Sequence, residues 1–218
     1  MFPTPEVRSV HYEKVYEPSE DSFLLLDCFE EEKPYLSTKF TDKTSSPVVV
    51  EIGTGSGIVT TFIQQNILPQ GIYIATDVNP HACRAVLDTA KVNAAHSIDT
   101  CQMSLTSAIR GNSVDVLVFN PPYVPADDVP AIPTTEDDET WLDLALCGGP
   151  EGMDVTWKVL DELDSTLSQQ GAAYILFCAR NKPDEVQEKM RARGWVVTEV
   201  LKRKAGWEVL SILRITRQ

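Results

Sequence analysis

Apolar residues along this chain follow two alternating patterns, which predict strands that alternate with helices. Short runs rich in β-branched residues predict buried strands, and four of them lie at residues 48–52, 72–76, 114–119 and 172–178. Apolar residues spaced three and four apart predict helices, which lie at residues 20–32, 80–93 and 183–193 and directly after the glycines of 53–57. One more helix is expected beyond Gly152, with the stripe Val155, Val159, Leu160, Leu163 and Leu167. This alternation indicates an α/β fold with a helix layer on each face of a sheet.

Two helix starts carry capping signals. Ser19 precedes the first helix and is expected to cap it. Asn79 followed by Pro80 is typical of an N-cap with proline at the first helical position. The helix that begins there should pack through the stripe Cys83, Val86, Leu87 and Ala90.

Three further strands complete the predicted sheet. Ile98–Met103 is expected to be a short edge strand, with apolar Ile98, Cys101 and Met103 exposed unless something covers them. Trp195–Leu201 and Glu208–Thr216 predict an antiparallel hairpin. We therefore expect a three-layer α/β/α, Rossmann-like sheet of seven strands, mostly parallel, that binds ligands at the carboxyl ends of strands one, two and four. We expect one domain over 1–218, with a cap segment and linker at 1–46 and a core at 47–218.

Composition and charge narrow the kind of ligand. The chain has 32 acidic and 19 basic residues and a formal charge of −13, whereas phosphate contacts need clustered Lys and Arg. We therefore expect no direct nucleic-acid partner. No apolar run approaches transmembrane length and the start of the chain resembles no signal peptide, so we expect no membrane partner and a cytoplasmic protein, with the nucleus as a second compartment. The five cysteines are scattered without a CxxC pair, which predicts reduced thiols and no metal site.

The strongest chemical signal is the segment Asn-Pro-Pro-Tyr, which follows the strand at 114–119. Two prolines stop the strand and stiffen the turn, so the Asn120 amide, the Pro121 carbonyl and the Tyr123 ring are held in fixed relation. An NH2 group on an sp2 carbon has two donor hydrogens, which the Asn120 oxygen and the Pro121 carbonyl are suited to accept. That arrangement would orient the nitrogen for alkyl transfer. A tight turn without chemistry is the alternative interpretation.

A glycine-rich turn and a carboxylate form the second signal. The strand at 48–52 runs into Gly53, Gly55 and Gly57, whose spacing lets the backbone approach a ligand but differs from the G-x-G-x-x-G of dinucleotide sites. Asp77, at the end of the next strand, is placed to accept the ribose hydroxyls of an adenosine-type ligand. Farther along, the Asp-, Glu-, Pro- and Thr-rich segment 126–139 predicts a solvated, mobile loop that frames a substrate.

In this order and spacing, the glycine segment 51–57, Asp77 and Asn-Pro-Pro-Tyr resemble a class I methyltransferase that uses S-adenosyl-L-methionine. Tyr-Glu-Pro-Ser-Glu-Asp-Ser-Phe at 16–23 and the hairpin segment Arg-Lys-Ala-Gly-Trp-Glu at 203–208 are similar to the eukaryotic and archaeal HemK-like branch. That branch methylates the glutamine amide in the Gly-Gly-Gln motif of class I translation release factors. Phe119–Pro125 and Ala179–Lys182 resemble a fungal member.

The resemblance implies roles for individual residues. Glu51 and Gly53, with Gly55, are expected along the methionine part of the cofactor, Asp77 at its ribose, Ser104 and Leu105 at its adenine, and Ser22 above it. Asn120 is expected to contact both the cofactor and the substrate. Pro121, Pro122 and Tyr123 are expected to hold the glutamine amide with Asn120. The family commonly has Asp where Ser104 stands, and a serine hydroxyl accepts a hydrogen bond without charge assistance.

The resemblance also implies partners. Eukaryotic members form heterodimers with a small zinc-binding activator subunit, for which the edge strand Ile98–Met103 is the expected contact by strand addition. The protein substrate would be the class I release factor, alone or with its GTPase partner. An N6-adenine or protein-lysine methyltransferase with the same Asn-Pro-Pro-Tyr site is the alternative within the enzyme class, and a non-catalytic scaffold is the alternative outside it.

Overall fold

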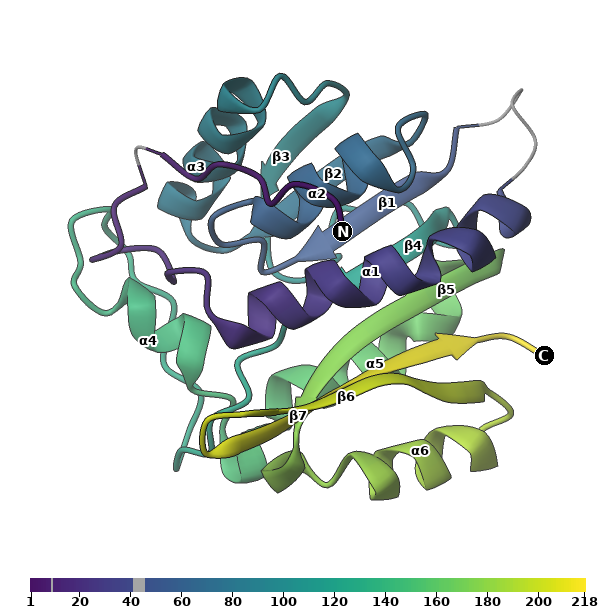
Figure 1. Cartoon of the computed structure of the whole chain (residues 1–218). Helices are drawn as coiled ribbons and strands as arrows, with labels where there is room; N and C mark the ends of the chain where they lie inside the picture. Colours follow the sequence, from purple (N-terminus) through teal and green to yellow (C-terminus); the bar gives the residue numbers. More distant parts are fainter. Residues whose placement is uncertain (9, 41–45) are drawn as a thin grey trace.

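Within the described part of the chain, seven strands form one sheet in the order β3-β2-β1-β4-β5-β7-β6 (Figure 1). The structure is a computed structural model and describes residues 1–8, 10–40 and 46–218. Neighbouring strands from β3 to β5 pair in parallel, whereas β7 runs antiparallel to both β5 and β6. The predicted fold, with its C-terminal antiparallel hairpin, is confirmed. The strands are β1 Val48–Ile52, β2 Ile72–Asp77, β3 Ile98–Gln102, β4 Val114–Phe119, β5 Leu167–Cys178, β6 Val196–Ala205 and β7 Glu208–Thr216.

Helices cover both faces of the sheet. Alternate residues of β5 point to opposite faces, so Tyr174 packs on the side of α1 and α2 while Ile175 packs on the side of α5 and α6. The helix α3 lies beside α2 and contacts β2 and β3, and α4 lies apart from these layers (Figure 1). The helices are α1 Glu20–Lys39, α2 Ile58–Asn66, α3 Pro80–Val92, α4 Trp141–Leu146, α5 Asp154–Thr166 and α6 Pro183–Ala192.

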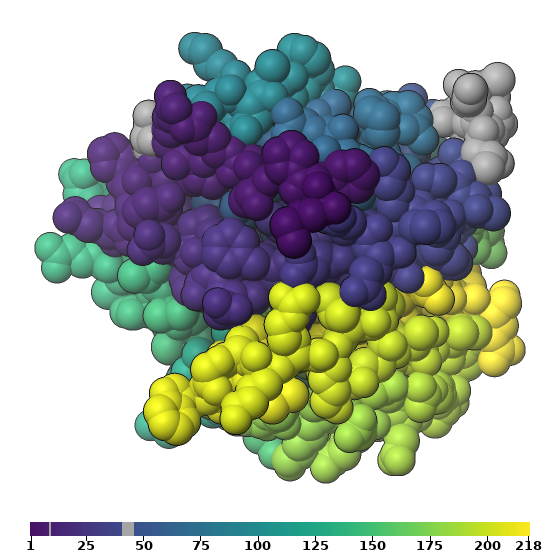
Figure 2. Space-filling model, in the orientation of Figure 1, coloured from purple at the N-terminus to yellow at the C-terminus, as the bar shows by residue number. Residues whose placement is uncertain are grey.

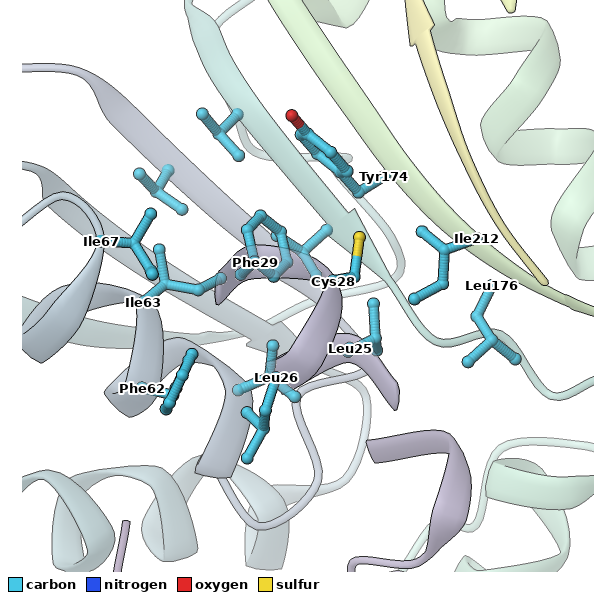
Figure 3. Close-up of a cluster of buried hydrophobic side chains, with 14 of the residues drawn as sticks. Leu25, Leu26, Cys28, Phe29, Phe62, Ile63, Ile67, Tyr174, Leu176 and Ile212 are labelled. Atoms are coloured by element: carbon cyan, nitrogen blue, oxygen red, sulfur yellow. The ribbon is translucent and has the colours of Figure 1, made fainter. Parts of the chain in front are cut away.

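The helix α1 is fixed to β5 and β7 by apolar and polar contacts. Phe29 packs on Tyr174 with ring centroids 4.9 Å apart (Figure 3). The Tyr174 hydroxyl donates to Glu32 Oε2 at 2.7 Å, and Arg214 Nη1 lies 2.5 Å from the same oxygen. The Arg214 guanidinium also lies 3.9 Å from the centroid of the Tyr35 ring. A carboxylate this buried is tolerated because both donors satisfy it, and the pairing fixes the second half of α1 against β5 and β7.

The predicted helix 20–32 is longer than expected. It continues to Lys39 through Pro34, although proline lacks the N–H that an interior helical position donates. Leu36 and Phe40, beyond the proline, are buried in the same core cluster as Leu25, and this packing outweighs the proline penalty. Ser19 occupies the N-cap position but makes no capping hydrogen bond with its side chain.

Other boundaries also differ from the predictions. Leu167 begins β5 instead of ending the α5 stripe, and Leu87 is 45% exposed instead of packed in the core. The edge strand ends at Gln102, so Met103 lies beyond it. The strand β6 runs past Leu201 to Ala205 because it stays paired with β7. Most of the predicted polar loop before β1, residues 41–45, lies outside the described residues. Within the ranges given above, none of the helices is both long and apolar enough to span a bilayer.

Candidate active site

The carboxyl ends of four strands and the start of α1 enclose a cavity of about 420 Å³, within the size range of small-molecule sites. It lies where β1 and β4 are neighbours and their connections leave in opposite directions, the usual ligand position in such sheets. Every residue predicted for the site lines this cavity, namely Ser22, Glu51, Gly53, Gly55, Asp77, Ser104, Leu105, Asn120, Pro121, Pro122 and Tyr123. The structure thus brings the sequence signals together in one place.

The glycine turn after β1 is held against β2. The backbone N–H groups of Gly53 and Thr54 both donate to the Thr76 carbonyl, at 2.8 and 3.2 Å. Gly57 has φ +78°, and a Cβ there would lie 2.7 Å from the Cα of Val86. Glycine is therefore required at this position by backbone conformation and by close contact with α3.

Asp77 is fixed at the end of β2 with both carboxylate oxygens engaged by backbone donors. The Gly55 N–H donates to Oδ2 at 3.2 Å and the Asn79 N–H donates to Oδ1 at 2.9 Å. Burial raises the pKa of Asp77 to about 6. Asn79 accepts from the His81 N–H and caps α3, as predicted. Asp77 therefore faces the cavity while Asn79 serves the helix.

Glu51 has a structural role that could not be predicted from its position in the sequence. Its Oε2 accepts from the Thr54 hydroxyl at 3.0 Å, from the Thr60 N–H at 3.1 Å and from the Thr60 hydroxyl. These bonds tie the end of β1 to the start of α2. Burial raises the pKa of Glu51 to about 7 in spite of the three donors.

Asn120 is oriented by a partner that the sequence analysis missed. Its Nδ2 donates to Oδ2 of Asp21, the second residue of α1, at 3.1 Å. Its Oδ1 is buried and has no hydrogen-bond partner among the described residues. Because a carboxylate only accepts, Asp21 fixes which end of the amide remains available. Asp21 is 3% exposed and also accepts from the Ser22 N–H at 2.6 Å. The only signal for it was its place in the segment that resembles the HemK-like branch.

Residues 148–152 and Asn181 pack against the backbone of the Asn-Pro-Pro-Tyr segment 120–123, which we call the corner. Asn181 Nδ2 donates to the carbonyls of Tyr123 and Glu151, both at 2.9 Å. A Cβ on Gly152 would lie 2.0 Å from the Tyr123 carbonyl oxygen, and one on Gly148 would lie 2.0 Å from the Pro122 oxygen. These glycines let the backbone pack directly under the corner, and neither was singled out from the sequence.

The remaining predicted residues differ in how they are held. The Tyr123 hydroxyl donates to Glu208 Oε2 at 3.2 Å, and burial and nearby carboxylates raise the pKa of Tyr123. Leu105 adopts φ +51°, and its carbonyl accepts from the Thr76 hydroxyl at 2.9 Å. Ser104 precedes it at the cavity wall. The start of α1 and the ends of β2, β3 and β4 thus surround the same cavity.

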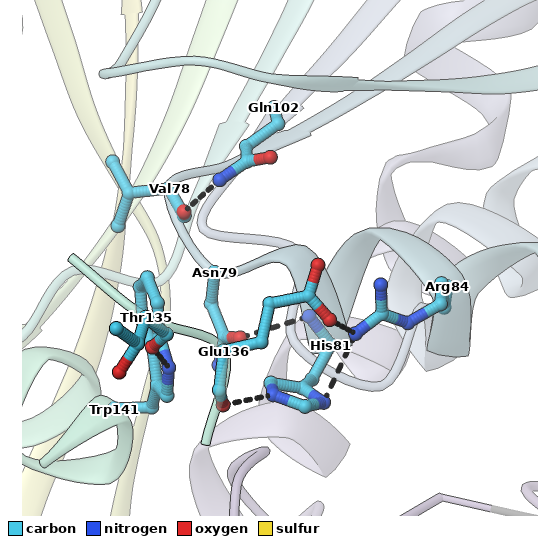
Figure 4. A network of polar contacts seen from close by, with 8 residues as sticks. All are labelled: Val78, Asn79, His81, Arg84, Gln102, Thr135, Glu136 and Trp141. Atoms are coloured by element: carbon cyan, nitrogen blue, oxygen red, sulfur yellow. Dashed lines mark hydrogen bonds and ion pairs between the residues drawn. The ribbon is translucent and has the colours of Figure 1, made fainter. Parts of the chain in front are cut away.

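The loop 126–139 contains no helix or strand, as its composition predicted, but it is anchored at several points. Glu136 pairs with Arg84 at 2.8 Å, and its carbonyl lies 2.8 Å from His81 Nε2 (Figure 4). Lys14 Nζ donates to the carbonyls of Asp137 and Asp138, both at 2.8 Å. Val129, Pro130 and Ile132 of the loop line the cavity. The loop is therefore joined to α3 and to the N-terminal segment.

The donor set at this cavity suits an organic ligand. In the part of the chain that the structure describes, no three His, Cys, Asp or Glu side chains are grouped as metal ligands would be. The glycine turn, the carboxylate of Asp77 and the apolar lining match the needs of a nucleoside bound with its polar groups at the strand ends.

Comparisons with known proteins agree with this geometry. A family model described as methyltransferase small domain matches residues 22–132. The eRF1 methyltransferase catalytic subunit mtq2 of Schizosaccharomyces pombe is 40% identical over 98% of this chain and 94% of its own length. The human methyltransferase HEMK2 is 34% identical over 94% of this chain and 91% of its own.

A solved structure shows the same likeness. It is the Mtq2–Trm112 complex of E. cuniculi, described as responsible for methylation of the eRF1 translation termination factor. It superposes with a TM-score of 0.67 at 26% identity and covers 94% of this chain and 99% of that one. The chain therefore belongs to the methyltransferase small domain family and is a methyltransferase.

Proposed function

We propose that this methyltransferase transfers the methyl group of S-adenosylmethionine to the side-chain amide nitrogen of the glutamine in the Gly-Gly-Gln motif of the eukaryotic class I release factor. Two relatives that cover nearly the whole chain are described by methylation of eRF1. We assign the same substrate to this chain. The assignment requires a site with acceptors for both N–H groups of a primary amide.

The observation that carries the proposal is the unpartnered oxygen of Asn120. Asp21 occupies the Nδ2 side of the amide, and Oδ1 is buried without a donor. A buried acceptor of this kind costs about 1–3 kcal/mol unless a donor reaches it. A primary amide supplies two N–H donors, one for Asn120 Oδ1 and one for the adjacent carbonyl of Pro121. The Tyr123 ring, held by Glu208, is placed to pack on the amide plane.

The other cavity residues fit the proposed cofactor. Asp77 would accept the ribose hydroxyls, the glycine turn and Glu51 would lie along the methionine part, and Ser104 and Leu105 would meet the adenine. Ser22 of α1 would close over the bound molecule. A carboxylate at the end of β2 and glycines at the end of β1 are the arrangement that α/β sheets use for nucleosides.

The chain contributes orientation and charge stabilisation to the reaction. The cofactor supplies an electrophilic methyl group on a sulfonium. Asn120 Oδ1 and the Pro121 carbonyl would hold the two N–H groups so that the nitrogen lone pair points at that carbon, and they would stabilise the positive charge that grows on nitrogen. Positioning of this type contributes about 7–11 kcal/mol in favourable cases. The nitrogen would gain the methyl group as the carbon–sulfur bond breaks, leaving a neutral thioether, and would lose one of its protons to water late in the transfer, so a strong general base is not needed at the start.

The exposed edge strand β3 would bind a small zinc-binding activator subunit. In a parallel pair, backbone groups of alternate residues face the neighbour. Met103 donates its N–H to the Asp77 carbonyl, so the odd-numbered residues of β3 face β2. The backbone N–H and carbonyl of the even-numbered Thr100 therefore point away from β2. Because Met103 also lines the cavity, its replacement would disturb the site itself. Thr100→Pro removes an outward N–H without touching the cavity and should abolish co-purification with the activator, whereas unchanged co-purification would exclude this contact.

Transfer of labelled methyl to purified release factor tests the proposed reaction. The assay includes the activator and uses, as a matched substrate, a release factor whose Gly-Gly-Gln glutamine is changed to alanine. Label on the native factor alone would establish the substrate and the acceptor residue. Asn120→Ala should depress kcat far more than cofactor affinity. Label on both factors, or label appearing only with adenine or lysine substrates, would contradict the proposal.

A further inference from the structure

The hairpin of β6 and β7 extends past the edge of the sheet at which the candidate site lies. The last pair between β5 and β7 is Cys178 with Leu210, but β6 and β7 remain paired through Lys204–Val209 and Ala205–Glu208. Residues 204–209 therefore form an overhang at the carboxyl end of β5. Figure 2 shows the hairpin, in yellow, reaching the rim of the molecule. We call residues 204–209 the hairpin tip.

The hairpin tip carries a fully exposed tryptophan. Trp207 is 101% exposed, whereas Ile132 and Ile72 are 52% and 51% exposed. It follows Gly206, which turns the chain with φ +57°. Tryptophan is enriched among the residues that anchor protein interfaces. Its position therefore indicates a surface that another molecule covers.

The tip is joined directly to the catalytic corner. Glu208, the residue after Trp207, accepts from the Tyr123 hydroxyl at 3.2 Å and pairs with Arg180 at 3.2 Å. The Cα of Trp207 is therefore about 3.8 Å from that of a residue that touches the corner. A glutamine that reaches Asn120 must bring its own backbone to the mouth of the cavity, so the surface around that glutamine lies within reach of Trp207.

If the activator subunit binds β3, its distance from the hairpin tip excludes it as the molecule that covers Trp207. The strands β3 and β6 are opposite edges of the sheet, six strand spacings or about 29 Å apart. Charge disfavours a nucleic acid, because the loop 126–139, from which Val129, Pro130 and Ile132 line the cavity, carries six carboxylates, at Asp127, Asp128, Glu136, Asp137, Asp138 and Glu139. Lys204 is the cation of the tip and forms no ion pair within the described ranges, whereas Glu208 of the tip is paired with Arg180.

We propose that the hairpin tip is a docking arm on which Trp207 anchors the folded protein substrate, through an apolar patch bordered by carboxylates, beside the methylated glutamine. This inference rests on the proposed function, because it requires that the substrate be a folded protein. A short peptide around the glutamine would enter the cavity without reaching the arm. The arm therefore contributes to the recognition of the intact protein and not to the transfer itself.

The test compares two substrates of the activator-bound enzyme: the intact release factor and a peptide of about fifteen residues that contains its Gly-Gly-Gln motif. Trp207→Ala should raise KM for the intact factor about tenfold to thirtyfold, the usual loss at an anchoring tryptophan. Its kcat and its KM for the peptide should not change. Val196→Ala is the matched control, since Val196 is 46% exposed at the start of β6, the strand whose other end leads into the turn that carries Trp207.

Each outcome separates the two proposals. An unlabelled release factor with the wild-type enzyme would remove the proposed function, and this inference with it. Label with the wild type but an unchanged KM for Trp207→Ala would remove the docking arm alone. An equal loss on the peptide, lost co-purification of the activator, or binding of single-stranded DNA that depends on Trp207 would also refute it.

Discussion

Replacing Asp21 with asparagine tests whether the orientation of Asn120 controls the reaction. In the native pair, the Asp21 carboxylate accepts from Asn120 Nδ2 at 3.1 Å and leaves Oδ1 without a partner. An amide in place of the carboxylate can donate as well as accept, so Asn120 is free to turn and lose its acceptor to the new neighbour. The change keeps the size of the side chain and removes only the charge and the fixed direction of the bond.

The magnitude follows from the kind of hydrogen bond that is lost. A buried bond to a charged group contributes about 1.5–3 kcal/mol, and 1.36 kcal/mol corresponds to a tenfold change in rate. Asp21→Asn should therefore lower kcat roughly 13-fold to 160-fold, with a much smaller change in cofactor affinity. Single-turnover methyl transfer measures the first quantity, and titration of the enzyme with S-adenosylmethionine measures the second.

Two further variants make the test specific. Asp27→Asn applies the same change to the same helix, at a residue whose ion pair with Arg203 is exposed, and should alter kcat less than twofold. The double variant Asp21→Asn/Asn120→Asp reverses donor and acceptor and still leaves an oxygen facing the substrate, so it should recover part of the lost kcat. A fall of less than threefold in Asp21→Asn, or an equal fall in cofactor affinity, would refute this account of Asn120.

Three other predictions concern the cavity and its supports. Because the pKa of Asp77 is about 6 and its ionised form would accept both ribose hydroxyls of the proposed cofactor, cofactor affinity should fall as the pH drops from 7 to 5; Asp77→Asn should abolish this dependence except for a step from Glu51, whose pKa is about 7. Without cofactor, the raised pKa of Asp77 has the opposite consequence for folding, since its contribution to stability is present below its ordinary pKa of 3.8 and is lost as the pH rises through about 6; urea unfolding at each pH measures it. Gly152→Ala should abolish kcat by displacing Tyr123, whereas Gly194→Ala, at a position that also has a positive φ but open space around it, should cost only about 1–2 kcal/mol of stability; equal effects would show that backbone strain alone matters. Glu32→Gln should destabilise the fold by about 3 kcal/mol because it leaves Arg214 without its charge partner, and an unchanged melting temperature would contradict this.

Local patterns predicted the features that lie within one segment. The strand that ends in Asn-Pro-Pro-Tyr, the glycine turn and the carboxylate of Asp77 each follow from neighbouring residues, because a proline or a glycine restricts the backbone where it stands. The edge strand β3 and the terminal hairpin followed from strand length and spacing. In the predicted sheet β1 lies beside both β2 and β4, so the strand order alone brings these three features to one edge of the sheet.

Contacts between distant segments could not be predicted in this way. Asp21 and Asn120 are 99 residues apart, and no periodicity connects them. Pro34 predicts the end of a helix, and only the burial of Leu36 in the tertiary core explains why α1 continues. The composition of 126–139 predicts a solvated loop, but composition does not show that Lys14 binds its backbone carbonyls. Each miss reflects tertiary packing that overrides or adds to a local preference.

The pairing of Glu32 with Arg214 has a consequence for synthesis on the ribosome. The two residues are 182 positions apart, so α1 emerges early while its anchor on β7 is among the last segments to appear. Until then the apolar face of α1, with Leu25 and Phe29, has no complete surface to bury it, and Asp21 has no fixed position over Asn120. The nascent chain therefore exposes the apolar face of α1, which is prone to non-specific association, for most of its translation. It gains its catalytic geometry only once the C-terminal hairpin is released.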